Sequence, residues 1–275
     1  MKFRYMTYTI RYDYSISYQF IQKLVWNCKN AHEGIVNAID GCRVGNNAHG
    51  PAEIASCGRD GKVRIWDQRV ADSVVTLDPS GIKSDCWTVA SGDACNDSDR
   101  CIVAGFDNGD VKMLDLRSMQ IRWETNLGNG VCHLAFDRKD IPMNKLHASC
   151  IEGQLSVFEM RTFNPKSGYA RLAHSMGKST VWSCLASPHN RDVVAVSRGD
   201  GSVKLLKYSY PMNRVSKDDE GLQTGVTGSW VELVESESLS SQPIVSLDWH
   251  PQKKGLIVTT SFDQLVKVVL ATGIA

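Results

Sequence analysis

The stretch "ASCGRDGKVRIWD", residues 55–67, places an Asp-Gly pair between two short runs rich in β-forming residues. Both residues of such a pair tolerate positive φ, so the pair favours the tight turn of a β-hairpin. The run after the turn alternates, with Val63 and Ile65 on one face and Arg64 and Trp66 on the other. This alternation predicts a β-strand on each side of the turn.

The same pattern returns four times along the chain. If Asp60 sets the register, its counterparts follow at spacings of 48, 44, 48 and 63 residues, at Asn108, Glu152, Asp200 and Asp263. A second set of apolar runs keeps the same order, at residues 35–39, 86–90, 131–136, 181–185 and 244–249. Periods in the 40s with short strands around a tight turn are typical of propeller blades of four strands each. A single blade cannot bury both of its faces, so blades must stack around an axis.

The sequence therefore predicts an all-β propeller with about five blades. Their expected bounds are about 31–80, 81–127, 128–174, 175–240 and 241–275. The fourth blade carries an insertion, residues 210–228, before a probable outer strand at 229–239. The mixed charges and glycines of this insertion predict a mobile loop.

The motifs resemble WD repeats. In that family a His, a Ser or Thr, the turn Asp and the Trp form a hydrogen-bonded structural tetrad. The resemblance implies this tetrad in the first blade, at His32, Ser56, Asp60 and Trp66. In later blades the Trp is replaced by Leu114, Phe158, Leu206 and Val269, where we expect buried apolar bulk without the polar tetrad.

A narrower resemblance covers the chain from about Asn30 to its C-terminus. Stretches such as "HEGIVNAIDG" (32–41), "DCWTVA" (85–90), "NGVCHLAFDRKDIPMNKL" (129–146) and "SFDQLVKVV" (261–269) are similar to Monad-type WD-repeat proteins, a family also described as dynein axonemal assembly factors. The run "FDRKDIPMNKL" is not required by a propeller, so we treat it as specific to this family. The resemblance implies a seven-bladed family fold, of which two N-terminal blades are expected to be missing from this chain.

The same resemblance implies a function. It implies a non-enzymatic, cytoplasmic interaction scaffold for the assembly or stability of axonemal dynein heavy chains in motile cilia. The implied partners are RuvB-like ATPases, prefoldin-like co-chaperone subunits, Hsp90 and the dynein heavy chains. A second hypothesis from another class is a propeller that reads a modified peptide or ubiquitin, which an aromatic cage or an acidic pocket at the channel mouth would favour.

Composition and motifs argue against other function classes. The 275 residues carry a net charge of +1 and are 22% charged, which does not suggest a general nucleic-acid or membrane-surface binder. Nine cysteines without a Cys-x-x-Cys pair fit reduced thiols in the cytosol. A phosphate loop, a His-Glu-x-x-His motif and paired metal ligands are all missing from the sequence, so we expect no cofactor, metal or enzyme activity. Cys132 and His133 are expected on opposite faces of a strand, which makes them a poor nucleophile and base.

The loops of a propeller offer a rigid platform for partners. Trp87 and Trp182 occupy equivalent positions at the start of two blades, either as exposed anchors or as packing between blades. Next to the turn register we expect a partner-binding rim that also contains Arg59, Phe106, Asp107 and Phe262, although such residues are more often solvated or partly packed.

Residues 1–30 form an atypical segment that contains five of the eight tyrosines. One interpretation is that it supplies a closing strand to the last blade. The other is a mispredicted or alternative first exon. An open arc of five blades exposes strand edges, so we expect the chain alone to be poorly soluble.

Overall fold

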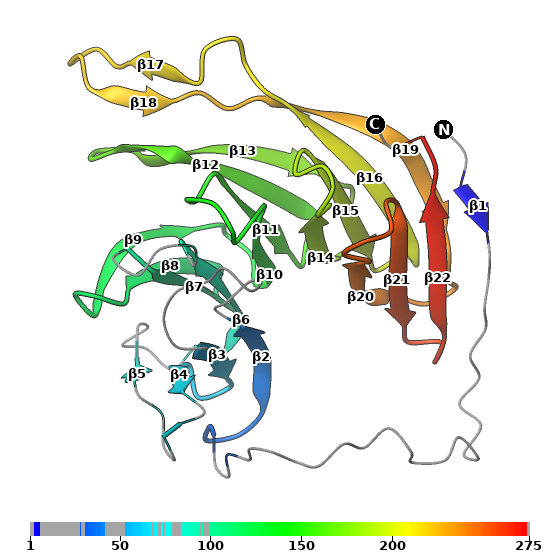
Figure 1. Cartoon of the computed structure of the whole chain (residues 1–275), viewed down its shortest axis with the longest axis horizontal. Coiled ribbons are helices and arrows are strands. Elements are labelled where there is room, and N and C mark those ends of the chain that lie inside the picture. The colour runs from blue at the N-terminus through cyan, green and yellow to red at the C-terminus, as the bar shows by residue number, and fades with distance from the viewer. Residues whose placement is uncertain are drawn as a thin grey trace.

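A computed structural model of the chain confirms the all-β fold. It describes residues 3–5, 28, 31–41, 53–67, 69–70, 73, 75–78, 84–93, 95 and 99–273. These residues form five four-stranded antiparallel sheets and one two-stranded sheet. Figure 1 shows the five larger sheets, the blades, following one another round an arc, with blades 1 and 5 at its two ends.

The first three blades each use four consecutive strands. Blade 1 contains β2 (Val36–Gly41), β3 (Glu53–Gly58), β4 (Val63–Asp67) and β5 (Val75–Leu77). Blade 2 contains β6 (Cys86–Gly92), β7 (Cys101–Phe106), β8 (Asp110–Asp115) and β9 (Gln120–Asn126). Blade 3 contains β10 (Val131–Phe136), β11 (Lys145–Cys150), β12 (Gln154–Asn164) and β13 (Gly168–Ser175).

The last two blades depart from this simple order. Blade 4 contains β14 (Val181–Ala186), β15 (Val193–Arg198), β16 (Ser202–Ser209) and β19 (Ser229–Ser238). Blade 5 contains β20 (Ile244–Trp249), β21 (Leu256–Ser261) and β22 (Val266–Ala271), and its fourth strand is β1 (Phe3–Tyr5).

The N-terminal strand β1 pairs antiparallel with β22, with Arg4 opposite Leu270. This pairing is what the closing-strand interpretation predicted. Apart from these three residues and Cys28, the tyrosine-rich segment 1–30 lies outside the described residues. The interpretation as an alternative exon stays a prediction.

Each core cluster joins two neighbouring blades, as the stacking argument requires. Ala55 and Val63 of blade 1 pack with Ile102 and Leu114 of blade 2. The four residues that replace the tetrad Trp are all buried, as expected: Leu114, Phe158, Leu206 and Val269. Fully burying a side chain of this kind contributes about 1.5–3 kcal/mol, so the stack holds without the polar tetrad.

The predicted turns all join the second and third strands of a blade. Four of them place a glycine at positive φ: Gly61, Gly109, Gly153 and Gly201. In blade 5, Gln264 takes the same left-handed conformation with φ 65°, which a non-glycine residue adopts only at a cost. These turns, with the starts of the first strands, form what we call the upper rim. The connections from first to second strand form the lower rim.

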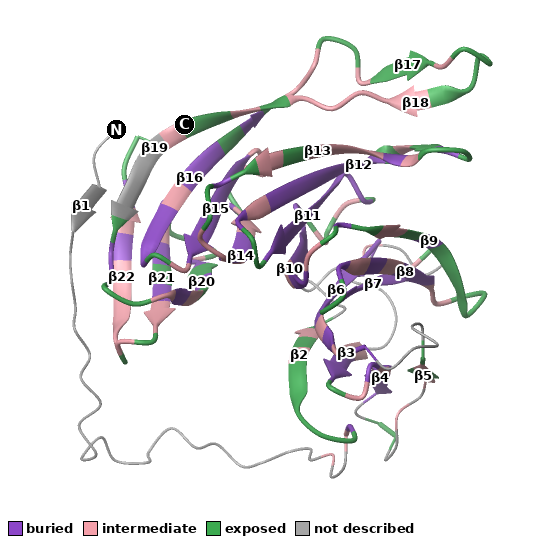
Figure 2. Cartoon of the chain, turned by 180° about the vertical axis from the view of Figure 1, so that it is seen from behind, coloured by how far each residue is buried: buried purple, intermediate pink, exposed green. Residues whose placement is uncertain are grey.

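The two ends of the arc leave apolar positions uncovered. Val131 and Leu134 of β10 are 0% and 2% exposed, because blade 2 packs against them. The corresponding Val36 and Ile39 of β2 are 45% and 69% exposed, and Figure 2 shows β2 as largely exposed. At the other end, Val258 is 39% exposed where its counterpart Ala55 in blade 1 is buried.

The expectation of a mobile insertion in blade 4 is wrong. Residues 210–228 contain a hairpin of β17 (Val215–Lys217) and β18 (Gln223–Gly225), and β18 packs against β12 and β13 of blade 3. Figure 1 shows this hairpin beside β12 and β13 along the outer side of the arc. The reason is side-chain anchoring: the Asn164 amide donates to Asp218 Oδ2 at 3.0 Å and Lys166 pairs with Glu220.

Candidate protein-binding site

The four residues of the implied tetrad form one hydrogen-bonded chain within blade 1. His32 Nδ1 lies 2.9 Å from Asp60 Oδ1, and His32 Nε2 lies 2.8 Å from Ser56 Oγ. The Trp66 indole donates to the same Ser56 oxygen at 2.8 Å. With Nδ1 protonated, His32 donates to Asp60 and accepts from the Ser56 hydroxyl. The chain therefore ties the entry of blade 1 to its second and third strands and leaves no free nucleophile.

Asp60 is held as a carboxylate by this arrangement. Burial alone would raise its pKa, but hydrogen bonds from the Glu33 amide, the His32 ring and the Lys62 amide together lower that pKa below its ordinary value. The amide of Glu33 donates to Asp60 Oδ2 at 3.0 Å. The charge of Asp60 is thus used for structure.

Blade 5 contains a reduced version of the same device. The Ser240 hydroxyl donates to Asp263 Oδ2 at 2.6 Å, and the Ser261 hydroxyl donates to Asp263 Oδ1. A search of the sequence for a His at the entry of each blade could not find the Ser240–Asp263 pair, because Ser240 stands at the blade 5 entry in place of a histidine.

Two charged residues expected on the upper rim do lie at its surface. The Arg59 side chain is 65% exposed and its Nε lies 3.4 Å from Asp85 Oδ2. Arg59 and Asp85 line an open cavity of about 470 Å³ together with Glu33 and Asp60. Asp107 accepts a hydrogen bond from the Ser84 hydroxyl. Both side chains therefore already have a polar partner within the upper rim, and Arg59 remains largely exposed.

The predicted aromatic residues of the upper rim divide into packed and exposed groups. The Trp87 ring lies against Gly130, where an added Cβ would stand 2.7 Å from the ring. Trp182 packs edge-on to Phe262 of blade 5 with ring centroids 6.2 Å apart, and Phe262 is 62% exposed. Both tryptophans thus contact the next blade, which was one of the two expected roles.

Phe106 does not belong to this surface, and its place in the predicted rim is corrected here. Its side chain is fully buried in the core between blades 1 and 2. It ends strand β7, where the alternation of the strand turns its ring inward.

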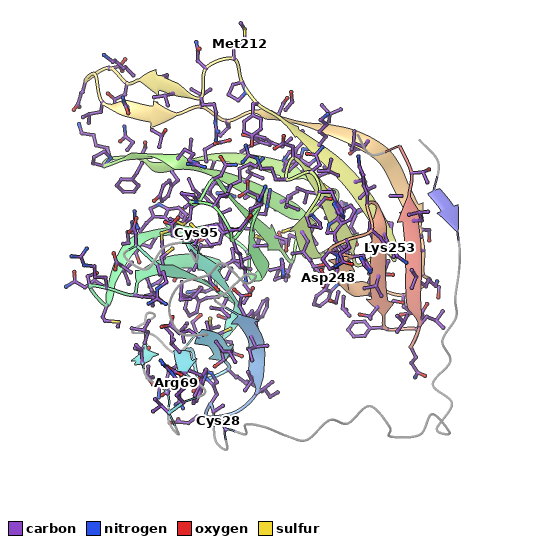
Figure 3. All side chains as sticks on the ribbon, viewed as in Figure 1. Cys28, Arg69, Cys95, Met212, Asp248 and Lys253 are labelled. Atoms are coloured by element: carbon purple, nitrogen blue, oxygen red, sulfur yellow. The ribbon has the colours of Figure 1, made fainter. Side chains whose placement is uncertain are left out.

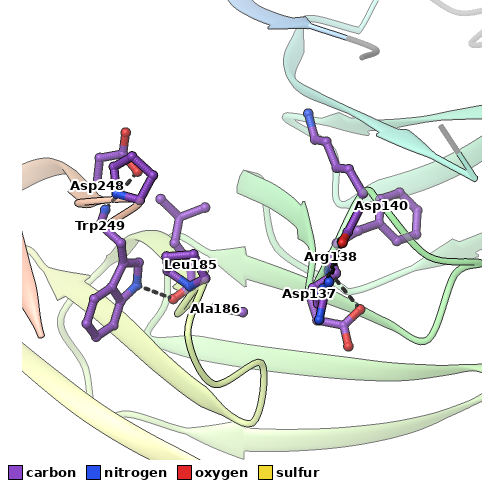
Figure 4. Close-up of a pocket in the computed structure, with 11 residues that line it drawn as sticks. Asp137, Arg138, Asp140, Leu185, Ala186, Asp248 and Trp249 are labelled. Carbon is purple, nitrogen blue, oxygen red and sulfur yellow. Dashed lines mark hydrogen bonds and ion pairs between the residues drawn. The ribbon is translucent and has the colours of Figure 1, made fainter. Parts of the chain in front are cut away.

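A cavity that sequence reasoning missed lies on the lower rim between blades 3, 4 and 5. Its volume is about 470 Å³, and it is lined where β10, β14 and β20 end. Asp137, Arg138, Lys139 and Asp140 form the blade 3 side, and Leu185, Pro188, Asp248, Trp249 and Pro251 are among the residues of blades 4 and 5 that line it. Figure 4 shows Asp137 and Arg138 facing Leu185 and Trp249 across this space, and Figure 3 labels Asp248, which belongs to β20. The run "FDRKDIPMNKL", singled out as unnecessary for a propeller, contributes the first side.

A buried charge network lies next to this cavity, under the insertion of blade 4. The Lys145 ammonium is fully buried, donates to Asp192 Oδ1 at 2.8 Å and to Tyr210 Oη at 2.6 Å, and stands 4.8 Å from the Tyr208 ring centroid. A buried charge is tolerated only when it is paired in this way.

Glu159 supplies the second half of the network. Its carboxylate accepts from Tyr208 Oη at 2.7 Å and from Arg214 Nη2 at 2.6 Å. Arg214 also donates to Asn144 Oδ1 at 2.9 Å. Residues of blade 3 and of the insertion therefore fix each other. Single-sequence reasoning could not find these pairs, because they are 55 and 70 residues apart.

The thiols next to histidines are structural. The sulfur beside the His133 ring belongs to Cys184, with 3.9 Å between Sγ and Nδ1. Burial raises the pKa of Cys132 to about 12 and that of Cys184 to about 12, so both stay protonated at neutral pH. Among the described residues, no group of three or more His, Cys, Asp or Glu side chains is arranged to hold a metal ion. Within the same part of the chain, no helix has the length and apolar character needed to cross a membrane.

Comparison with known proteins agrees with this architecture. The family described as WD domain, G-beta repeat matches residues 22–67. A β-propeller domain of Cps50 (Swd1) from Myceliophteria thermophila, known from its crystal structure, superposes with a TM-score of 0.63 at 14% identity, over 89% of this chain and 67% of that one. At that identity the likeness concerns the fold alone.

Curated relatives are far more similar in sequence. Dynein axonemal assembly factor 10 of Chlamydomonas reinhardtii is 47% identical over 262 residues, which cover 90% of this chain and 73% of the relative. The Homo sapiens protein of the same name is 49% identical over 244 residues, covering 88% and 68%, and the Xenopus laevis protein is 50% identical with the same coverage. Identity at this level over this much of both chains shows common descent, and the chain belongs to the dynein axonemal assembly factor 10 family of WD-repeat propellers.

Proposed function

We propose that this protein is a non-enzymatic interaction scaffold that helps axonemal dynein heavy chains to assemble or to remain stable in motile cilia. The observation that carries the proposal is the identity of 47–50% to relatives named dynein axonemal assembly factor 10. The architecture supports it, because a propeller presents two loop-bearing rims on a rigid stack. The carboxylates of the tetrad and of the buried network, and the thiols, serve structure, and the proposal takes surface complementarity as the means of action.

The finer details of the proposal come from the family resemblance. The scaffold works in the cytoplasm with RuvB-like ATPases, prefoldin-like co-chaperone subunits and Hsp90. These partners supply the energy, and the propeller holds the client or an adaptor on its rims. The seven-bladed family fold also stays a proposal, and the exposed Val36, Ile39 and Val258 support it, because a further blade at either end would cover them.

The test is depletion of the protein in cells that build motile cilia. The proposal predicts cilia that form but beat poorly, with axonemal dynein heavy chains reduced in cytoplasmic extracts before any loss from the axoneme. Re-expression of the chain restores both. Normal heavy-chain levels and normal motility in depleted cells would contradict the proposal.

A second candidate function is a reader of a modified peptide or of ubiquitin. The exposed Phe262 beside Trp182 on the upper rim is the observation that favours it. Phe262→Ala would then abolish binding to ubiquitin or to a methylated peptide in a titration with purified protein. The scaffold function predicts no binding to either probe.

A further inference from the structure

The cavity on the lower rim is lined by apolar and by charged side chains, and not every charged side chain has an ion-pair partner. Leu185 of blade 4 and Pro251 of blade 5 contribute accessible apolar surface, and the buried Trp249 lies beside them in the core between these blades. The Trp249 ring is fixed there, because its indole N–H donates to the Leu185 carbonyl at 2.9 Å. At about 470 Å³ the cavity lies within the range of about 300–1,000 Å³ that is usual for binding pockets.

The two cations that line the cavity are already paired. Arg138 pairs with Asp140, and Lys139 pairs with Asp40 of blade 1, while Lys139 also donates to the Gly41 carbonyl at 3.1 Å. Both pairs lie on the blade 3 side of the cavity. Neither cation therefore needs a further anionic partner.

Two carboxylates remain without a cation. Asp137 is fixed by the amides of Arg138 and Lys145 and by the Asn144 side chain, at 3.0, 3.2 and 2.6 Å. Asp248, exposed on the blade 5 side, accepts the amide of its neighbour Trp249 at 2.8 Å. Within the part of the chain that the structure describes, neither carboxylate has an ion-pair partner. Asp137 is buried and its two oxygens are occupied by these donors, whereas Asp248 is exposed, so Asp248 is the carboxylate of this cavity that can meet a cation from outside.

We propose that this cavity docks a segment of a protein partner through a lysine or arginine side chain flanked by apolar residues. The inference rests on the proposed scaffold function and names the partner chemistry that one of its surfaces selects. The aliphatic stem of Lys or Arg covers apolar surface while its charged end stays at the polar margin, which is the combination that Leu185, Pro251 and the exposed Asp248 offer. The guanidinium of Arg can also pair with a carboxylate through two hydrogen bonds.

The test uses the purified full chain and short acetylated, fluorescently labelled peptides. The peptides share one Leu- and Pro-containing sequence and differ at one central residue, which is Arg, Lys, Gln or Glu. Fluorescence anisotropy is expected to show the Arg and Lys peptides binding about tenfold or more tightly than the Gln peptide, which corresponds to about 1.4 kcal/mol. The Glu peptide is expected to bind weakest, and the preference is expected to shrink at high salt.

Variants assign the preference to this cavity. Asp248→Asn, an isosteric change at an exposed side chain, is expected to remove most of the preference for Arg over Gln, and Asp248→Lys to reverse it in favour of Glu. Glu152 lines a different cavity, on the upper rim. Glu152→Gln is therefore the matched control and is expected to leave the preference unchanged. Equal binding of all four peptides, or an unchanged preference in Asp248→Asn, would overturn the inference. The scaffold function would survive that result if the wild-type chain still captures dynein heavy chains, so the two failures are distinguishable.

Discussion

At the residue scale, Ser56 shows how one hydroxyl can hold three parts of a blade together. It lies on β3, accepts the indole N–H of Trp66 on β4 and bonds to His32 at the entry of the blade. All three groups are buried. Loss of the hydroxyl would remove a buried hydrogen bond from each of the two rings.

Ser56→Ala is therefore expected to lower the free energy of unfolding by about 1–3 kcal/mol, the cost of leaving buried polar groups unsatisfied. Urea unfolding followed by tryptophan fluorescence measures the change. Ser216→Ala, on exposed β17, is the control and should be neutral within about 0.5 kcal/mol. A loss at Ser56 no larger than at Ser216 would show that the tetrad does not contribute to stability.

His147 makes stability depend on pH. Its ring is fully buried, and neither ring nitrogen has a hydrogen-bond partner among the described residues. Burial, and then the charge of Lys145, lower its pKa to about 3. The folded state therefore binds fewer protons than the unfolded state at any pH between this value and the ordinary histidine value of about 6.5.

As the pH falls below about 6.5, His147 is expected to remove up to about 1.4 kcal/mol of stability per pH unit. Above that pH this proton-linked loss of stability is absent, because the ring is neutral in both the folded and the unfolded state. His147→Leu, which replaces an unsatisfied polar ring by an apolar side chain, should be at least as stable at pH 7 and lose less stability between pH 6.5 and 4.5. Urea unfolding across that pH range measures the difference. If the wild type and His147→Leu lose the same stability, His147 is not a source of the acid sensitivity.

At the scale of single elements, the β17–β18 hairpin illustrates what a sequence can and cannot predict. The alternation and turns of the blade strands are local signals, so the five blades could be predicted from the sequence. The hairpin of the insertion has no such signal, and its charges and glycines suggested a mobile loop. Its order comes from pairs such as Glu159 with Arg214, which only the folded chain brings together.

Glu159→Gln is expected to release this hairpin while leaving the blades intact. The change removes the negative charge that holds Arg214 and Tyr208, so the hairpin amides between 215 and 225 should exchange with solvent at least about tenfold faster, equivalent to about 1.4 kcal/mol. Hydrogen exchange with peptide resolution measures this. Glu232→Gln, a change at an exposed carboxylate that pairs with Lys204, is the matched control. Unchanged exchange in the hairpin would show that packing on blade 3, and not the charge network, fixes it.

The candidate site was predicted less completely than the fold, because much of it depends on residues that are far apart in the chain and leave no local sequence signal. Arg59 and Phe262 follow the turn register, so their exposed positions on the upper rim could be read from the sequence. Phe106 stands one position earlier, equivalent to Gly58 and Ser261, where it ends a strand and lies in the core. The lower-rim cavity depends on three strand ends that lie 50 or more residues apart in the chain, and only the run "FDRKDIPMNKL" hinted at it.

At the scale of the whole molecule, the uncovered ends of the arc decide how the chain behaves in solution. Val36, Ile39 and Val258 offer apolar sheet surface to water, which favours association. We expect the chain alone to be poorly soluble. Ile39→Lys should raise its solubility at little cost in stability, whereas Leu134→Lys, at the equivalent buried position of blade 3, should unfold the protein.

Solubility after centrifugation and thermal unfolding of both variants check this expectation. A wild-type chain that is a soluble monomer and melts cooperatively would contradict it. So would an Ile39→Lys variant as unstable as Leu134→Lys, because the end face would then be covered in solution.

The central claim is that this propeller works as an assembly scaffold for axonemal dyneins, and affinity purification of the endogenous protein from ciliated cells tests it most directly. Mass spectrometry of the whole eluate is predicted to recover dynein heavy chains together with RuvB-like ATPases and prefoldin-like subunits. Recovery of histones or ubiquitylated proteins without these chaperones and without dynein heavy chains would contradict the claim and favour a reader of modified peptides.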